Sequence, residues 1–174
     1  MTDAGRFEAL VREYQDMVYA TALRLLANAA EAEDVAQTVF LKAFERFDEI
    51  GASPAVAGWL KTVTTNICLN HLSRYRSRWR FFSELPDEGI DARLGCASSL
   101  VSQLEQASEH ERLERALRRL PDAQRVSIVL FHFEGKSYQE IAELLGVSLA
   151  KVKTDIHRGR EVLRKVLTAG HGSR

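Results

Sequence analysis

Apolar residues recur at helical spacing along most of the chain. One amphipathic stripe runs from Phe7 to Leu25, and a second follows the N-cap residue Asn28 as far as Phe47. The second stripe includes Phe44, which we expect to be buried with its apolar neighbours. Because each periodic segment has the spacing of an α-helix, the pattern predicts an all-α protein.

A third helix is expected from Pro54, since Ser53 and Pro54 combine an N-cap residue with a proline in the first helical position. Residues 48–53 before it are typical of a turn. Cations alternate with aromatics toward the end of this helix, from Arg74 to Arg80. Guanidinium groups on phosphates, beside rings and amides that meet unstacked bases, are typical of single-stranded DNA binding. A basic helix end with aromatics in a core is the alternative interpretation.

Residues 81–108 differ in composition from the segments on either side. They contain Pro86, glycines, serines and a cluster of acids, which together predict a flexible acidic linker. We therefore expect two small helical domains, over residues 1–80 and 109–174, joined by this linker.

Residues 137–167 are typical of two helices joined by a tight turn. Ser137 and Glu140 can form a capping box for the first helix, Gly146 ends it, and Ser148 can cap the second. In a helix-turn-helix the second helix enters the major groove of DNA. Its polar side has the candidate DNA-binding residues Lys151, Lys153, Thr154, His157, Arg158 and Arg160. A solvated basic helix in an α-bundle is the alternative interpretation.

The formal net charge is zero, but the charges are segregated along the chain. Residues 1–51 and 81–111 have net charges of −5 and −6, whereas residues 52–80 and 112–174 have +5 and +6. Two basic segments imply two separate anion-binding surfaces, each with an acidic companion.

Several other classes of protein are disfavoured by the sequence. No apolar run approaches the ~20 residues that span a bilayer, and the N-terminus lacks the features of a signal peptide, so we expect a cytoplasmic protein without membrane insertion. Cys68 and Cys96 lie far apart without a CxxC motif, which indicates neither a disulfide framework nor a zinc knuckle. Cys68 and His71 have no further ligand pair at suitable spacing, so no metal or cofactor is expected.

His132 lies in an apolar stretch, where we expect a packed core residue.

The order of these segments resembles the extracytoplasmic-function (ECF) subfamily of bacterial RNA polymerase sigma factors. The resemblance lies in the segments AEDVAQTVFLKAFERFDEI, GWLKTVTTNICLNHL with its basic continuation, LPDAQR, and SYQEIAELLGVSLAKVKTDIHRGREVL. It implies an all-helical promoter-specificity subunit without catalysis of its own. The partners that it implies are core RNA polymerase, promoter DNA and an anti-sigma factor.

The resemblance also implies roles for particular residues. The coiled coil of the polymerase's largest subunit would be bound by Asp34, Gln37 and Leu41, although from the residues alone Leu41 is better interpreted as an ordinary exposed leucine. The downstream (minus-10) promoter element would be bound by Trp59, Lys61, Asn66, Asn70, Arg74, Arg76 and Arg78. The upstream (minus-35) element would be bound by Lys153, Thr154, His157 and Arg158, with Lys151 and Arg160 near its backbone.

Three residues depart from the usual family pattern. Thr38 stands where Glu is common, and His157 adds a titratable group to the recognition helix. Asp155 stands where a basic or small polar residue is more usual; it could accept a hydrogen bond from cytosine or pair with a neighbouring Arg.

The competing hypothesis is a stand-alone helix-turn-helix regulator, which would not need the basic and aromatic stretch from Trp59 to Trp79. An enzyme of nucleic acids is disfavoured, because no acidic metal cluster or phosphate-binding glycine loop is present.

Overall fold

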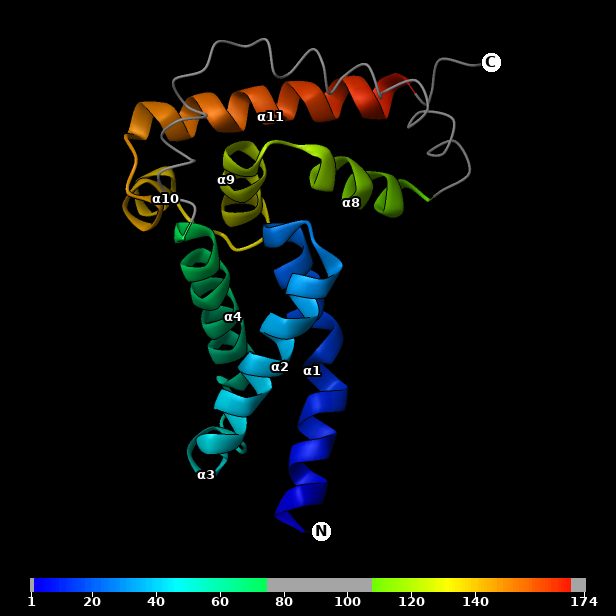
Figure 1. Ribbon diagram of the computed structural model, residues 1–174, viewed down its shortest axis with the longest axis vertical. Helices are drawn as coiled ribbons and strands as arrows, with labels where there is room; N and C mark the ends of the chain where they lie inside the picture. Colours follow the sequence, from blue (N-terminus) through cyan, green and yellow to red (C-terminus); the bar gives the residue numbers. More distant parts are fainter. Residues whose placement is uncertain (1, 75–107, 170–174) are drawn as a thin grey trace. The chain divides into compact units, whose positions relative to one another are not determined.

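The computed structural model describes residues 2–74 and 108–169, and every regular element within these ranges is an α-helix (Figure 1). Contacts between Cα atoms divide the chain into two compact units, Met1–Arg74 and Tyr75–Arg174. We call them unit 1 and unit 2 and describe each by itself. The predicted all-α fold class is confirmed.

Unit 1 contains α1 (Asp3–Leu26), α2 (Ala29–Glu45), the short α3 (Phe47–Ile50) and α4 (Val56–Ser73). Helix α1 packs against both α2 and α4, and α2 also packs against α4. These three helices enclose an aliphatic core that includes Leu10, Val18, Leu25, Val35, Val39 and Leu60.

The corner between α1 and α2 is two residues long. Ala27 ends α1 in the left-handed conformation, with φ 54°, and its N–H donates to the Leu23 carbonyl at 2.8 Å. Asn28 then begins α2, because its side-chain oxygen accepts from the Glu31 N–H at 3.0 Å. The predicted Asn28 cap is confirmed, and the tight corner brings the two helices side by side.

Two local predictions in unit 1 were wrong. The segment expected to be a turn contains the helical turn α3, and α4 begins at Val56 rather than at Pro54. The Ser53 hydroxyl accepts from the Ala55 N–H at 3.2 Å, and the Ser53 carbonyl accepts from the Val56 N–H at 3.2 Å. These bonds hold residues 53–56 in a turn, so the helix starts after it.

Unit 2 contains α8 (Glu109–Arg119), α9 (Asp122–His132), α10 (Tyr138–Leu145) and α11 (Leu149–Ala169). Ser137 and Glu140 form the predicted capping box at the start of α10, and Gly146 ends this helix with φ 65°. The Ser148 hydroxyl accepts from the Lys151 N–H at 3.1 Å and so caps α11. The predicted helix-turn-helix is therefore α10 and α11.

Helix α11 crosses α9 at a glycine. A Cβ atom on Gly159 would lie 2.3 Å from Cδ1 of Ile128 and 3.4 Å from Cβ of Gln124. Glycine at this position lets α11 approach α9 more closely than any other residue would, so α11 rests directly on α9.

Arg125 lies in the core of unit 2 and connects the end of α8 to the start of α9. Its side chain is only 2% exposed; it donates to the Leu120 carbonyl at 3.1 Å and pairs with Asp122 at 2.7 Å. The bond to Leu120 occupies a backbone acceptor at the end of α8, and a buried guanidinium without these partners would be costly.

The predicted linker, residues 81–108, lies almost entirely outside the described residues, as do Arg76 and Arg78. Within the described ranges, no helix is both long enough and apolar enough to cross a membrane.

Candidate nucleic-acid and protein interfaces

Helix α11 separates an apolar side from a polar one along its length. Its buried residues Val152, Ile156, Gly159 and Leu163 recur at three- and four-residue spacing and face the rest of unit 2. Four of the predicted DNA-binding residues are exposed on the opposite side: Lys153, Thr154, His157 and Arg158. The structure thus brings these four together on one surface, which we call the α11 face.

Lys151 does not join the α11 face as a free cation. Its Nζ lies 2.6 Å from Oδ2 of Asp155, one helical turn later, and the two side chains are 24% and 13% exposed. Asp155 therefore has a cationic partner within its own helix, which is a lysine and not the arginine considered from the sequence.

Arg160 is held on the other edge of α11. Its guanidinium lies 3.0 Å and 3.2 Å from Nε2 of His132 on α9, through Nη2 and Nε, and 5.5 Å from the centre of the Phe131 ring. His132 is exposed, so the prediction of a packed core histidine was wrong. Partial burial of the His132 ring against its neighbours and the Arg160 guanidinium both lower the pKa of His132, because each disfavours the imidazolium form. The neutral ring accepts the hydrogen bond from Arg160.

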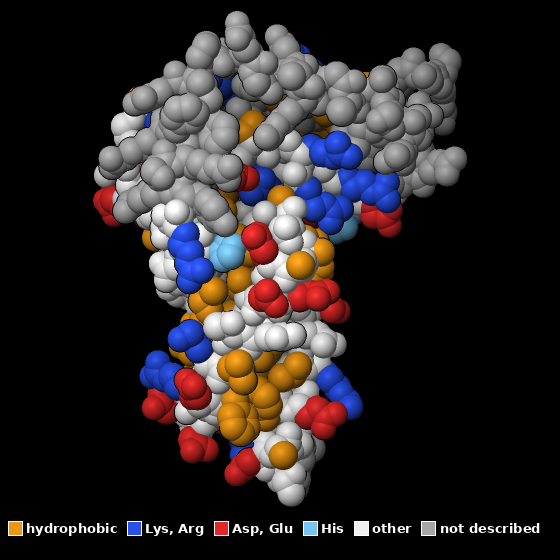
Figure 2. All heavy atoms as spheres, in the orientation of Figure 1, with side chains coloured by type: hydrophobic (Ala, Val, Ile, Leu, Met, Phe, Trp, Pro, Cys, Tyr) orange, Lys and Arg blue, Asp and Glu red, His pale blue; other side chains and the backbone are white. Residues whose placement is uncertain are grey.

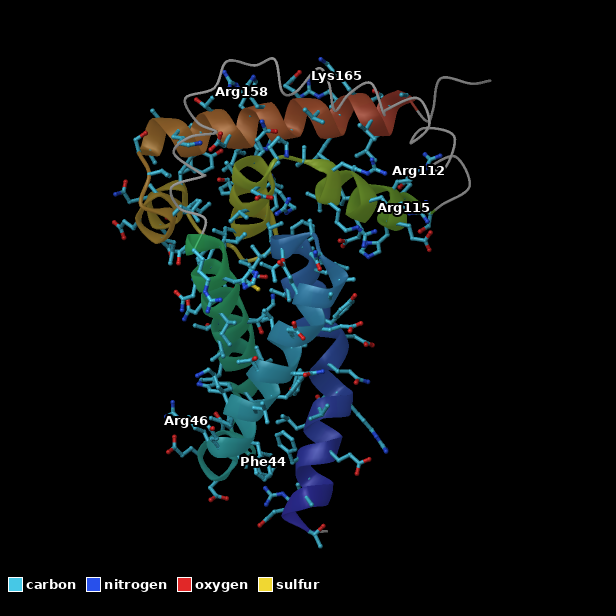
Figure 3. All side chains as sticks on the ribbon, in the orientation of Figure 1. Phe44, Arg46, Arg112, Arg115, Arg158 and Lys165 are labelled. Carbon is cyan, nitrogen blue, oxygen red and sulfur yellow. The ribbon has the colours of Figure 1, made fainter. Side chains whose placement is uncertain are left out.

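Sequence reasoning missed one cation beside the α11 face. Lys165 is exposed and follows Arg158 by seven residues, a spacing that places both on the same side of a helix, about 10 Å apart along its axis. Both side chains lie along the edge of α11 turned away from α8, which has Arg112 and Arg115 (Figure 3). The seven-residue interval was the available signal for Lys165.

Helix α4 has a polar surface with little charge. Asn66 and Asn70 are exposed one turn apart and share a side of the helix with Trp59, which is half-buried. Arg74, immediately after the helix, is exposed as well. We call these four residues the α4 face. Lys61 is half-buried and, only two residues after Trp59, lies on another side of the helix, so the structure does not place it with them.

The end of α4 is tied to α2 by a histidine. Nε2 of His71 lies 3.2 Å from Oε1 of Glu31, and both side chains are about one-third exposed. Because His71 directly follows Asn70, the last turns of α4 lie beside α2 at this point.

The exposed side of α2 combines polar residues with large apolar ones. Asp34, Gln37 and Leu41 are exposed at three- and four-residue spacing, and the Leu41 side chain is 65% exposed. Phe44 lies one turn beyond Leu41 and is 60% exposed, so the prediction that it is buried was wrong. Ala43 takes the inward position in this turn, and Phe44 lies about 100° further round the helix.

Phe44 extends an apolar area on unit 1. Its ring packs edge-to-face on the ring of Phe7, with 5.1 Å between the ring centres. Phe7 packs in the same way on Phe47, with 5.5 Å between the ring centres. Figure 2 shows orange side chains gathered on the part of unit 1 where α2 ends. We call Asp34, Gln37, Leu41 and Phe44 the α2 face. An exposed aromatic beside an exposed leucine is typical of a protein-binding surface.

No group of three or more potential metal-ligating side chains occurs among the residues that the structure describes. Cys68 is buried within unit 1.

Comparisons with known protein families match the N-terminal and C-terminal parts of the chain separately. The model of Sigma-70 region 2 matches residues 10–79, and that of Sigma-70 region 4 matches residues 110–163. The chain is 30% identical to the RNA polymerase sigma-H factor of Pseudomonas aeruginosa over 95% of this chain and 88% of that protein. The ECF RNA polymerase sigma factor SigW of Bacillus subtilis is 29% identical, over 95% of this chain and 90% of SigW. The chain belongs to the ECF subfamily of RNA polymerase sigma factors.

One further relative supports this assignment, and one solved structure shares the fold. The ECF sigma factor SigE of Mycolicibacterium smegmatis is 37% identical over 96% of this chain, which spans 63% of SigE. The sigma factor RpoE of Bartonella quintana, solved in complex with the anti-sigma factor NepR, has a similar fold. The likeness has a TM-score of 0.51 at 21% identity and covers 93% of this chain and 96% of RpoE.

Proposed function

We propose that this sigma factor directs core RNA polymerase to promoters through three surfaces with separate tasks. The α11 face reads the duplex of the minus-35 element, the α4 face captures a strand of the melted minus-10 element, and the α2 face binds the polymerase. The sigma factor itself performs no catalysis.

The observation that supports this proposal most directly is the exposure of the α11 face. Lys153, Thr154, His157 and Arg158 are all exposed on the second helix of a helix-turn-helix. Arginine and lysine donate to guanine in the major groove, threonine can bond either donor or acceptor edges, and cations also neutralise phosphates. The buried side of α11 meanwhile rests on α9 at Gly159, so these side chains stand on a rigid support.

For the α4 face, the composition favours single-stranded DNA. The amides of Asn66 and Asn70 can bond base edges that are free only in separated strands, and the Trp59 ring can stack on an unpaired base. Arg74 lies after the helix, where it can follow the phosphates. Melting would then be driven by binding, since flipped bases make contacts that paired bases cannot.

For the α2 face, the partner is a protein. Leu41 and Phe44 offer apolar area, while Asp34 and Gln37 offer hydrogen-bonding groups beside it, the mixture expected at the edge of an interface core. We assign this face to the coiled coil of the polymerase's largest subunit. An anti-sigma factor that covers the same face would compete with polymerase; the similar fold of RpoE has been solved in complex with an anti-sigma factor, NepR.

Run-off transcription with purified core polymerase tests the proposal. The template is the DNA upstream of the gene for this chain, and a transcript that depends on added sigma factor is expected. Replacing both Leu41 and Phe44 with Ala should weaken core binding at least tenfold, because buried apolar anchors dominate such interfaces. The matched control is Lys42→Ala, which alters an exposed residue of α2 outside the α2 face. Absence of a transcript, together with tight duplex binding by the sigma factor alone, would instead indicate a stand-alone regulator.

A further inference from the structure

The recognition helix contains an ion pair between Lys151 and Asp155 near its N-terminus. The two charged atoms lie 2.6 Å apart, and the Asp155 side chain is 13% exposed. Because both groups are largely shielded from water, salt screens their attraction less than it screens an exposed surface pair. The pair should therefore persist at the salt concentrations at which promoters are bound.

The low exposure of the pair, and not its place along α11, favours its formation. Lys151 is the third residue of the helix, where the positive end of the helix dipole disfavours a cation, and a lysine one turn before an acid is the weaker of the two orders; the carboxylate offsets part of that unfavourable interaction. Asp155 also gains, since an unpaired carboxylate at this low exposure would be costly.

Lys151 also borders the α11 face. It precedes Arg158 by seven residues and so lies on the same side of the helix. Released from Asp155, its ammonium group would stand beside Arg158, where it could neutralise one more phosphate. Lys153, by contrast, is exposed and has no ion pair among the described residues, so it is available to the DNA.

We propose that Asp155 sets the sequence-independent share of this sigma factor's affinity for promoter DNA, by holding Lys151 in an ion pair and away from the phosphates. Phosphate contacts raise affinity for every sequence alike, whereas base contacts distinguish one sequence from another. Withholding one phosphate contact lowers affinity for every sequence alike, and Asp155 thus sets how tightly the α11 face binds DNA without touching a base. The inference rests on the proposed function of the α11 face.

The test measures holoenzyme binding to two duplexes at several salt concentrations. One is the DNA upstream of the gene for this chain, and the other is the same DNA with its upstream element scrambled. For Asp155→Asn we expect the slope of log affinity against log salt to steepen by about 0.9, the value of one phosphate contact. Affinity for both duplexes should rise several-fold at low salt, by the same factor. Lys151→Ala alone should leave the slope unchanged, and the double variant should return it to that of the unaltered protein.

Each other outcome overturns the inference. If Asp155→Asn lost affinity only for the duplex with the natural upstream element (the matched duplex), and the slope of log affinity against log salt stayed the same, Asp155 would be a base-reading residue. A gain that persists in the double variant would mean that the carboxylate simply repels phosphate. A shallower slope for Lys151→Ala alone would mean that Lys151 binds phosphate despite its partner.

Two controls separate this inference from the proposed function. Lys153→Ala should make the slope shallower by about 0.9. If it does not, or if the unaltered holoenzyme fails to prefer the matched duplex, the assignment of the α11 face fails instead. Helical circular dichroism of each variant shows whether α11 has remained folded.

Discussion

Helices α4 and α11 are both candidate DNA-binding elements, but their exposed sides differ in chemistry. Helix α4 exposes Asn66 and Asn70, and its only cation, Lys61, lies half-buried on another side. Helix α11 exposes Lys153 and Arg158 among its first turns and Lys165 beyond them. Neutral amides suit base edges, whereas cations suit the dense phosphate charge of a duplex. This difference supports the proposed division of tasks, in which α4 binds melted DNA and α11 binds paired DNA.

The supports of the two helices also differ, and glycine substitutions should show this most strongly. Gly159→Val places a branched side chain where Ile128 already lies, and we expect the free energy of unfolding to fall by about 3 kcal/mol. Gly58→Ala on α4 is the matched control: its Cβ would meet nothing within 4 Å, so helix propensity should stabilise the protein by roughly 0.5–1 kcal/mol. Urea unfolding of the full chain, followed by helical circular dichroism, measures both. Equal and small effects would show that α11 does not rest on α9 as tightly as the structure indicates.

Arg158→Ala and Asn70→Ala should sharpen the contrast between paired and melted DNA. Loss of a base contact from Arg158 should cost about 2 kcal/mol on a duplex with the minus-35 element. Asn70→Ala should leave that duplex unaffected and weaken binding to a single-stranded minus-10 oligonucleotide by about 1 kcal/mol, the worth of one hydrogen bond. Fluorescence anisotropy of the holoenzyme on each probe gives both values. If each variant lost affinity on both probes, the division of tasks between the two helices would be wrong.

The smallest expected effect concerns pH and the contact between α9 and α11. Because the pKa of His132 is lowered in the folded protein, the unfolded chain takes up a proton at higher pH than the folded chain does. Stability should therefore fall as the pH drops below about 6.5, the ordinary value for histidine, and stop changing below the lowered pKa.

Urea midpoints between pH 7.5 and 5 measure this dependence. His132→Gln should make it weaker, since glutamine can accept from Arg160 without titrating. His110→Gln is the matched control, because His110 is an exposed histidine of α8 and takes no part in the contact with Arg160. An unchanged pH dependence in His132→Gln would show that folding does not lower the pKa of His132.

Local sequence signals predicted the helices and most of their ends. The Asn28 cap, the capping box of Ser137 and Glu140, and the Gly146 terminus were all confirmed, because each depends on residues at most four apart. The same locality explains the exposure of Lys153, Thr154, His157 and Arg158, which follows from the 3.6-residue period alone. The sequence also assigned the family, through the order of its motifs.

Tertiary structure decided what lies against each face. Arg160 is bound to His132, 28 residues away, and Phe44 is exposed although its apolar neighbours are buried. Periodicity gives a helix an inner and an outer side, but it does not say how wide a strip the neighbouring helices cover or which side chains they bring to its edges. The width of the covered strip and the side chains at its edges depend on how the helices pack. In this protein, packing leaves Lys153 and Arg158 facing solvent, whereas Arg160 is bound by His132 of α9.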